Sequence, residues 1–172
     1  MVTLLPSQRV DAIYKSGRYA CALKRLEEAE RERKFCRHDL KHFTDVARIA
    51  ALLNAEFSAG CPADEIYAAA LLHDIGRAEH TEDHAKESAR FAGEILPECG
   101  FESEETERII RAILAHGEKQ EDISIQTARE RAKGSGALSA LILCADKLSR
   151  NCFDCAARGE CYWKKKTERI WI

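Results

Sequence analysis

Long apolar runs, strand-like alternation and proline are all scarce in this chain of 172 residues. No stretch approaches the roughly 18 apolar residues that a membrane-spanning helix needs, and the N-terminus lacks the charged-then-apolar pattern of a secretory signal. Sustained alternation of apolar and polar residues is nearly absent, and there are only three prolines. We therefore expect a cytoplasmic protein of the all-α class without a membrane partner.

An excess of charge of either sign is missing as well. The chain has 27 lysines and arginines against 29 acidic residues, and its net charge of −2 gives no general attraction to nucleic acid. Basic residues do concentrate over 24–41 and at 164–166. Glutamates interleave with the first of these groups, which favours a solvated helix face over a polyanion site.

Helical periodicity divides the chain into consecutive segments. We expect one or two helices over 7–33, and further helices over 39–58, 62–76, 81–100, 103–116 and 137–149. In the segment 103–116 the buried side should include Ile109, Ile110, Ile113 and Leu114. The polar segment 117–136 should be a long loop with at most one short helix. The simplest organisation is a single domain over 1–172, with N-terminal helices (1–36), a core (37–150) and a C-terminal tail (151–172).

Histidines and aspartates lie in or beside these apolar segments. The clearest are His73 and Asp74, which end the apolar run 68–72 and would be costly to bury without a partner such as a metal ion. The other members of the set are His42, His84, His116 and Asp146. Spread over about a hundred residues, these cannot form a local zinc finger, but helices of a bundle could bring them to one metal centre. The pattern therefore predicts an enzyme.

The order and context of these residues resemble the HD-domain superfamily of metal-dependent phosphohydrolases. The matching segments are His42-Phe-Thr-Asp-Val-Ala-Arg-Ile-Ala, Ala-Leu-Leu-His73-Asp74-Ile-Gly-Arg, His84-Ala-Lys-Glu-Ser-Ala, Ile-Leu-Ala-His116-Gly and Ala-Asp146-Lys-Leu. They cover about 38–150. The presence of both His84 and His116 makes the chain similar to the dinuclear branch of this superfamily. That branch includes bacterial symmetrical diadenosine-tetraphosphate hydrolases and cyclic-dinucleotide phosphodiesterases.

The resemblance implies an HD-domain helical bundle with two metal ions. By that resemblance, the first ion would be held by His42, His73, Asp74 and Asp146. Asp74 would bridge to a second ion, which His84 and His116 would complete. Imidazole and carboxylate ligands favour Fe or Mn, and two such ions can generate a hydroxide that attacks phosphorus. The implied reaction is hydrolysis of a phosphoester or phosphoanhydride in a small substrate, a nucleotide or dinucleotide.

Two of the ligand positions have a second histidine one helical turn earlier, on the same face. His38 precedes His42, and His80 precedes His84. The residues that follow favour His42 and His84 as ligands. His38 is then a candidate contact to metal or substrate phosphate, and His80 is expected to be exposed or to support a ligand.

The phosphate groups of a substrate need positively charged side chains to bind them. Arg77 and Lys147 are the candidates, and with Asp74 they would form the catalytic residues at the phosphate that reacts. Arg77 follows the His-Asp pair by three residues, where a guanidinium could bind phosphate through two nitrogens. Lys147 follows Asp146, but adjacent helical residues diverge by about 100°, so it could equally face solvent. Arg150 is a weaker candidate. Surface ion pairing is the alternative for each.

The last group of cysteines, Cys152, Cys155 and Cys161, follows the final helix. A Cys-x2-Cys pair with a third cysteine six residues later suits tetrahedral zinc or, alternatively, an iron–sulfur cluster. Three free thiols are the simplest alternative. A metal there would fasten the tail 159–172 over the mouth of the active site, with Trp163 and Trp171 packing that tail onto the core.

The fourth cysteine ligand is predicted from helix geometry to be Cys36. It lies six residues before His42, as Cys152 lies six residues after Asp146. If the two helices run antiparallel through a shared metal, both cysteines sit about 9 Å along the same direction.

The function that we predict is metal-dependent phosphohydrolysis. The competing hypothesis is a non-catalytic module that uses the same pocket to sense a phosphorylated ligand or the metal or redox state. The complete ligand set favours the enzyme. A nuclease is disfavoured by the net charge. The oligomeric state stays open.

Overall fold

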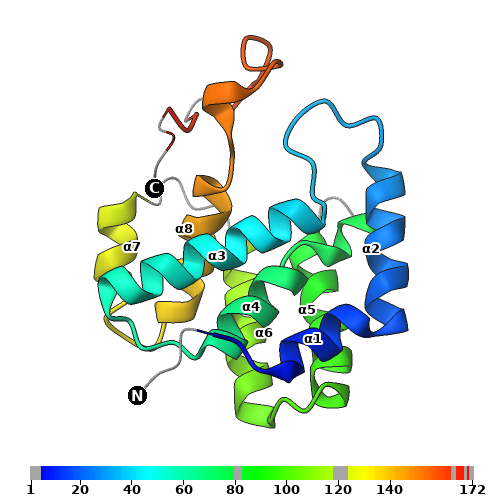
Figure 1. Ribbon diagram of the computed structural model, residues 1–172, viewed down its shortest axis with the longest axis vertical. Helices are drawn as coiled ribbons and strands as arrows, with labels where there is room; N and C mark the ends of the chain where they lie inside the picture. The colour runs from blue at the N-terminus through cyan, green and yellow to red at the C-terminus, as the bar shows by residue number, and fades with distance from the viewer. Residues whose placement is uncertain (1–4, 80–82, 118–123, 164–165, 169, 171–172) are drawn as a thin grey trace.

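Helices make up the regular structure of the chain in the computed structural model, which describes residues 5–79, 83–117, 124–163, 166–168 and 170 (Figure 1). The elements in chain order are α1 (Gln8–Lys15), α2 (Gly17–Ala29), α3 (Leu40–Phe57), α4 (Ala63–Leu72), the 3₁₀ helix η1 (Ile75–Ala78), α5 (His84–Glu98), α6 (Ser103–Gly117), α7 (Ile125–Arg131), α8 (Ala137–Leu148) and the 3₁₀ helix η2 (Cys152–Asp154). No strand occurs within these ranges. The all-α class is therefore confirmed.

Helix α4 lies at the centre of the bundle. Nearly all of its residues are buried, and Ala68, Ala69 and Ala70 are fully inaccessible. Small side chains allow close approach, and α4 packs against α3, α6 and α8. The N-terminal helices join the same core, because the Tyr19 hydroxyl donates a hydrogen bond to the Leu71 carbonyl at 3.1 Å. The C-terminal end of α4 is thus held between elements from the whole chain.

The start of α3 is fixed by a side-chain cap. The Asp39 carboxylate accepts a hydrogen bond from the backbone N–H of His42 at 2.8 Å, which satisfies one of the free N–H groups of the first turn. At the other end, Ser58 adopts a left-handed conformation with φ of 54°. The cap therefore sets the turn that carries His42.

Helix α4 ends earlier than the sequence predicts. It stops at Leu72 instead of continuing to Gly76, and the chain turns through η1. The backbone of Gly76 lies against α5, where its N–H donates to Ser88 Oγ at 2.9 Å and a Cβ would stand 2.5 Å from Ser88 N. The tighter turn leaves His73 and Asp74 at the junction between the two elements.

Three other expectations are refined. The segment 7–33 forms the pair α1 and α2, and α2 already ends at Ala29. The segment 117–136 contains the short helix α7. In α6, Ile109 and Ile113 are buried as predicted, but Leu114 is 40% exposed, because it follows Ile113 by one residue and so turns away from the core. The predicted helix start at 81–82 and His80 lie outside the described residues.

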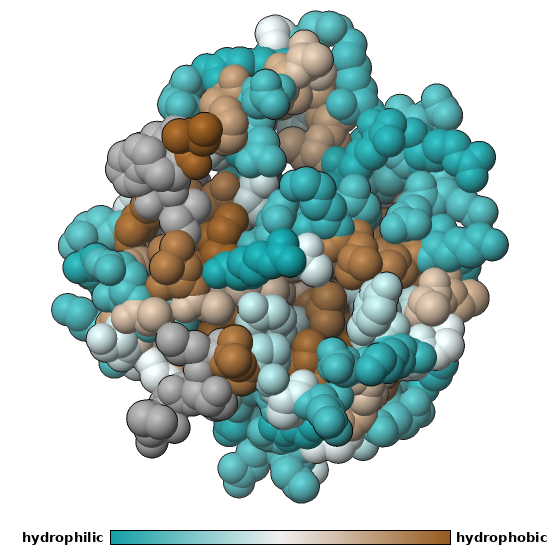
Figure 2. Space-filling view, viewed as in Figure 1, coloured by the Kyte–Doolittle hydropathy of each residue, from teal (hydrophilic) through white to brown (hydrophobic). Residues whose placement is uncertain are grey.

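The face of the molecule drawn in Figure 2 is largely hydrophilic, with apolar patches separated by polar side chains. None of the described helices is long and apolar enough to span a membrane.

Candidate metal centre

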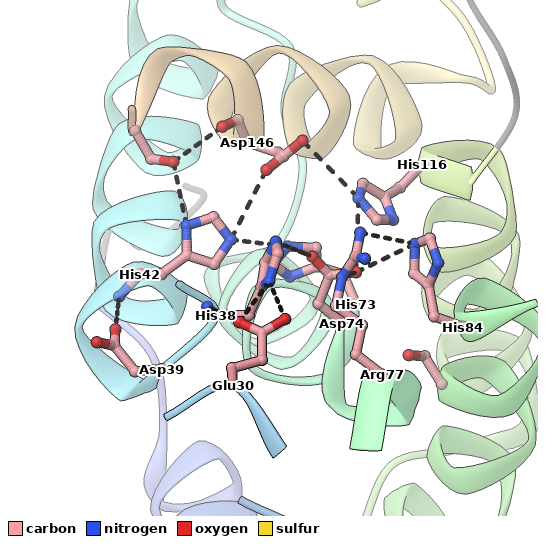
Figure 3. A network of polar contacts seen from close by, with 12 residues as sticks. Glu30, His38, Asp39, His42, His73, Asp74, Arg77, His84, His116 and Asp146 are labelled. Atoms are coloured by element: carbon pink, nitrogen blue, oxygen red, sulfur yellow. Dashed lines mark hydrogen bonds and ion pairs between the residues drawn. The ribbon is translucent and has the colours of Figure 1, made fainter. Parts of the chain in front are cut away.

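The six predicted ligands come together at the C-terminal end of α4 (Figure 3). Ligand atoms of His42, His73, Asp74 and Asp146 all lie within 4.8 Å of one another, and the same holds for Asp74, His84 and His116. The side chains come from α3, the α4–η1 junction, α5, α6 and α8. Asp74 is common to both groups. The structure thus places these residues in the same two sets that the family resemblance implies.

The Asp74 carboxylate is surrounded by imidazole nitrogens. Its Oδ1 lies 3.2 Å from His84 Nε2 and 3.8 Å from His116 Nε2, and its Oδ2 lies 3.5 Å from His73 Nε2. The side chain is 1% exposed and neither oxygen accepts a hydrogen bond from a described residue, although the Arg77 guanidinium forms an ion pair with Oδ1 at 2.7 Å from Nε. A buried carboxylate faced by several imidazole nitrogens is costly unless cations compensate it. Divalent ions held by the two ligand groups would add to the charge of Arg77 and compensate this burial.

The tautomers of two histidines can be read from their hydrogen bonds. His73 Nδ1 donates to the Ala70 carbonyl at 2.7 Å. His42 Nδ1 lies 3.3 Å from Ser149 Oγ, which itself donates to the Asp146 carbonyl and therefore accepts from the imidazole. Both Nε2 atoms are then lone-pair acceptors, and they face each other at 3.3 Å. Two facing lone pairs are the arrangement of ligands around a cation.

Burial keeps these imidazoles neutral. Desolvation lowers the pKa of His42 and of His73 to about 4 each, and it also lowers the pKa of His116. At neutral pH all three can therefore offer a lone pair to a metal ion.

The two buried aspartates are ionised. Burial alone would raise the pKa of Asp146, but Lys147, His116 and Arg150 outweigh that effect and hold it below its usual range. Burial likewise opposes ionisation of Asp74, whose pKa is nevertheless held well below the ordinary value by the nitrogens around it, those of His116 and His73 foremost. Neutral imidazoles and charged carboxylates form a donor set that fits divalent metal ions.

The predicted phosphate-binding cations lie at the carboxylates. Arg77 Nε is 2.7 Å from Asp74 Oδ1. Lys147 Nζ is 2.6 Å from Asp146 Oδ2, so this lysine turns toward the centre although a solvent-facing position was open to it. Arg150 Nη2 is 3.6 Å from the same oxygen.

His38 is buried in the centre but belongs to neither ligand group. Its Nε2 lies 3.3 Å from Asp74 Oδ2, and its Nδ1 lies 2.8 Å from Glu30 Oε1. The Glu30 carboxylate also accepts the backbone N–H of His38 at 2.7 Å. Nothing in the amino-acid pattern singles out Glu30, because it is one of several glutamates around the end of α2.

A cavity of about 310 Å³ opens onto the first ligand group. His38, His42 and Asp146 are among the residues that line it. The lining also includes the four cysteines singled out in the sequence, Cys36, Cys152, Cys155 and Cys161, together with Arg37, Arg150, Arg158 and Lys166.

Trp163 reaches back to the end of α8, where the Arg150 guanidinium lies 4.6 Å from the centre of its ring. Trp171 and residues 164–165 lie outside the described part of the chain.

The class of this protein is an α-helical bundle with an internal histidine–aspartate centre that could hold a metal ion. Comparison with protein families matches residues 39–151 to the HD domain, and the chain belongs to this family. A protein of Clostridium beijerinckii (strain ATCC 51743 / NCIMB 8052), described as uncharacterized, is 39% identical over 168 residues, which are 95% of this chain and 98% of the relative. No solved structure matches the chain.

Proposed function

We propose that the protein is a metal-dependent phosphohydrolase with two divalent ions, Fe or Mn. The observation that carries the proposal is Asp74, a buried carboxylate shared by two ligand groups. Imidazole nitrogens face both of its oxygens, and the Arg77 guanidinium forms an ion pair with one of them. Membership of the HD family supports it. Two divalent ions would supply a water-derived nucleophile and stabilise charge at phosphorus.

The protein groups would divide the remaining work. The hydrogen bonds of His42 Nδ1 and His73 Nδ1 orient both rings and keep their Nε2 atoms free of protons. Arg77, Lys147 and Arg150 would neutralise the phosphate oxygens, since each already lies beside a ligand carboxylate. No side-chain nucleophile is needed in this scheme.

The substrate that we propose is a small phosphorylated compound, with a nucleotide or dinucleotide as the first choice. A cavity of about 310 Å³ lies at the lower end of the range for ligand pockets. The basic side chains on its wall suit an anion, and Phe35 and the nearby Trp163 offer aromatic surface. We also propose that the protein belongs to the dinuclear branch of the family and is cytoplasmic. Diadenosine tetraphosphate is therefore a suitable test substrate.

The experiment is hydrolysis of a panel of phosphomonoesters, phosphodiesters and nucleoside polyphosphates by the full chain with Mn²⁺ or Fe²⁺. His73→Ala and Asp74→Ala should each reduce turnover below detection while circular dichroism stays helical. Asp11→Asn, on an exposed part of α1, is the matched control and should keep full activity. Turnover that survives in either ligand variant would contradict the mechanism.

The second candidate function is a sensor that binds a phosphorylated ligand without hydrolysing it. The observation in its favour is that four cysteines share the cavity with the histidine–aspartate centre. A metal-loaded chain that binds a nucleotide from the panel in calorimetry, yet turns over none of them, would favour this function.

A further inference from the structure

Four of the eight cysteines line the cavity at the metal centre, although they come from opposite parts of the chain. Cys36 lies in the loop 31–38 before α3, and the other three lie in the segment 151–163 after α8. Both segments rise from the upper side of the bundle in Figure 1. They also contact each other, through an ion pair between Lys34 and Glu160 and an edge-to-face contact of Phe35 with Tyr162 at 6.0 Å between ring centres.

The three cysteines after α8 follow one another along successive tight turns. Cys155 N donates to the Cys152 carbonyl at 3.5 Å, Arg158 N to the Cys155 carbonyl at 3.0 Å, and Cys161 N to the Arg158 carbonyl at 3.4 Å. Cys155 is extended and separates the 3₁₀ helix η2 from a further turn over 156–160. This folded-back path brings all three cysteines to the lining of the cavity.

Apolar packing does little to hold this segment. Within 151–163, Cys152 is the one buried residue, whereas Tyr162 is 74% exposed and Phe153 and Trp163 are also exposed. A short segment without a core of its own commonly depends on a metal or a disulfide for order. The cysteines of the segment are where such a link would form.

Positive charges lie around the four cysteines. Four thiolates on one divalent zinc ion carry a net charge of −2, and Arg37, Arg150, Arg158 and Lys166 line the same cavity. Arg158 Nη1 donates to the Cys152 carbonyl at 3.1 Å, and Lys166 Nζ donates to the Cys161 carbonyl at 3.2 Å. These cations would offset the negative charge of a four-thiolate zinc site, whereas without metal, burial raises the pKa of the Cys36 thiol.

We propose that Cys36, Cys152, Cys155 and Cys161 bind one zinc ion as four thiolates, at a structural site distinct from the histidine–aspartate centre. Among the described residues, the groups with ligand atoms within 4.8 Å of one another are the two histidine–aspartate sets, so the four sulfurs stand further apart than they would around zinc. Zinc binding would therefore draw the loop 31–38 and the segment 151–163 together and tighten one wall of the cavity, since Zn–S bonds are about 2.3 Å long.

Cobalt substitution in the full chain tests the site independently of any activity. Sulfur-to-cobalt charge-transfer bands arise from thiolate ligands alone, so metal at the histidine–aspartate centre does not produce them. We expect one such Co²⁺ ion per chain, displaced by Zn²⁺. The bands should disappear in Cys36→Ser and in Cys155→Ser. They should persist in the double variant Cys21→Ser, Cys99→Ser, whose cysteines do not line the cavity.

Limited proteolysis provides a second measurement on the same variants. Cleavage within 151–163 should become faster in Cys36→Ser and Cys155→Ser, and in the wild type after chelation, while circular dichroism confirms that the bundle stays folded. Absence of thiolate bands in the wild type would overturn the proposal. Bands that survive in Cys36→Ser, or iron with iron–sulfur absorption in the purified protein, would do the same.

Discussion

Glu30 orients a histidine of the metal centre from outside the ligand set. Its carboxylate contacts both His38 Nδ1 and the His38 backbone N–H, and hydrogen bonds from His38 outweigh burial and lower the pKa of this glutamate. A charged acceptor on Nδ1 fixes the orientation of the ring, so that Nε2 faces Asp74 Oδ2 at 3.3 Å. Glu30 is therefore a positioning residue for the centre.

Glu30→Gln keeps the size of this side chain but removes its charge. We expect metal affinity to fall about 10-fold, because Glu30 holds His38 against Asp74, the carboxylate shared by both ligand groups. Glu27→Gln, on the exposed side of the same helix, is the matched control and should change nothing. Calorimetric titration with Mn²⁺ measures both. Equal affinities in the two variants would show that His38 needs no charged partner.

For single residues, the sequence predicted the candidate metal ligands better than the residues that position those ligands. His73 and Asp74 could be recognised because ionisable groups at the end of an apolar run need a partner. Glu30 could not, because its neighbours Glu27, Glu28 and Glu32 have the same residue type and only the fold decides which of them is buried. Ser149 was missed for a similar reason, since its contact with His42 joins residues 107 apart in the chain.

The junction between η1 and α5 controls where His84 lies. Gly76 packs directly against the first turns of α5, so a Cβ at this position would stand 2.5 Å from Ser88 N and 2.7 Å from the His84 carbonyl. Backbone atoms cannot move aside as a flexible side chain can. The spacing of the two elements depends on the absence of a side chain.

Gly76→Ala should destabilise the protein by about 1–3 kcal/mol, the usual range for overpacking, and should displace the helix turn that carries His84. Gly93→Ala in the same α5 is the control, because its Cβ would meet Ile110 Cδ1 at an ordinary 3.5 Å. That variant should gain about 0.5–1 kcal/mol from helix propensity. Urea unfolding measures both, and equal effects would contradict the packing argument.

Element positions followed from periodicity, but element ends did not. The apolar stretch of α4 predicted a buried helix, whereas its end at Leu72 depends on how closely Gly76 approaches Ser88, which is a tertiary contact. The exposed Leu114 is a related case. An apolar residue on a helix need not be buried, and its neighbour Ile113 already occupies the core position.

Across the whole molecule, the metal centre links elements that are distant in sequence. A ligand that binds only the folded state stabilises it by about 2.7 kcal/mol at 100 times its Kd. For a chain of this size that corresponds to a rise in Tm of roughly 5–10 °C. We expect Mn²⁺ to produce such a rise in the wild type and none in Asp74→Ala. Scanning calorimetry measures it, and an equal rise in both proteins would place the bound metal elsewhere.

Helices α1 and α2 lie outside the segment matched to the HD family but pack against it. The HD match begins at residue 39, yet Arg9 on α1 pairs with Asp64 at 2.6 Å and with Glu105 at 2.7 Å, and Tyr19 and Glu30 reach the centre of the bundle. A fragment trimmed to the matched segment would lose these contacts and expose the apolar surfaces that α1 and α2 cover. A fragment meant to fold therefore has to retain the first two helices, because the packed bundle extends beyond the segment that the family match delimits.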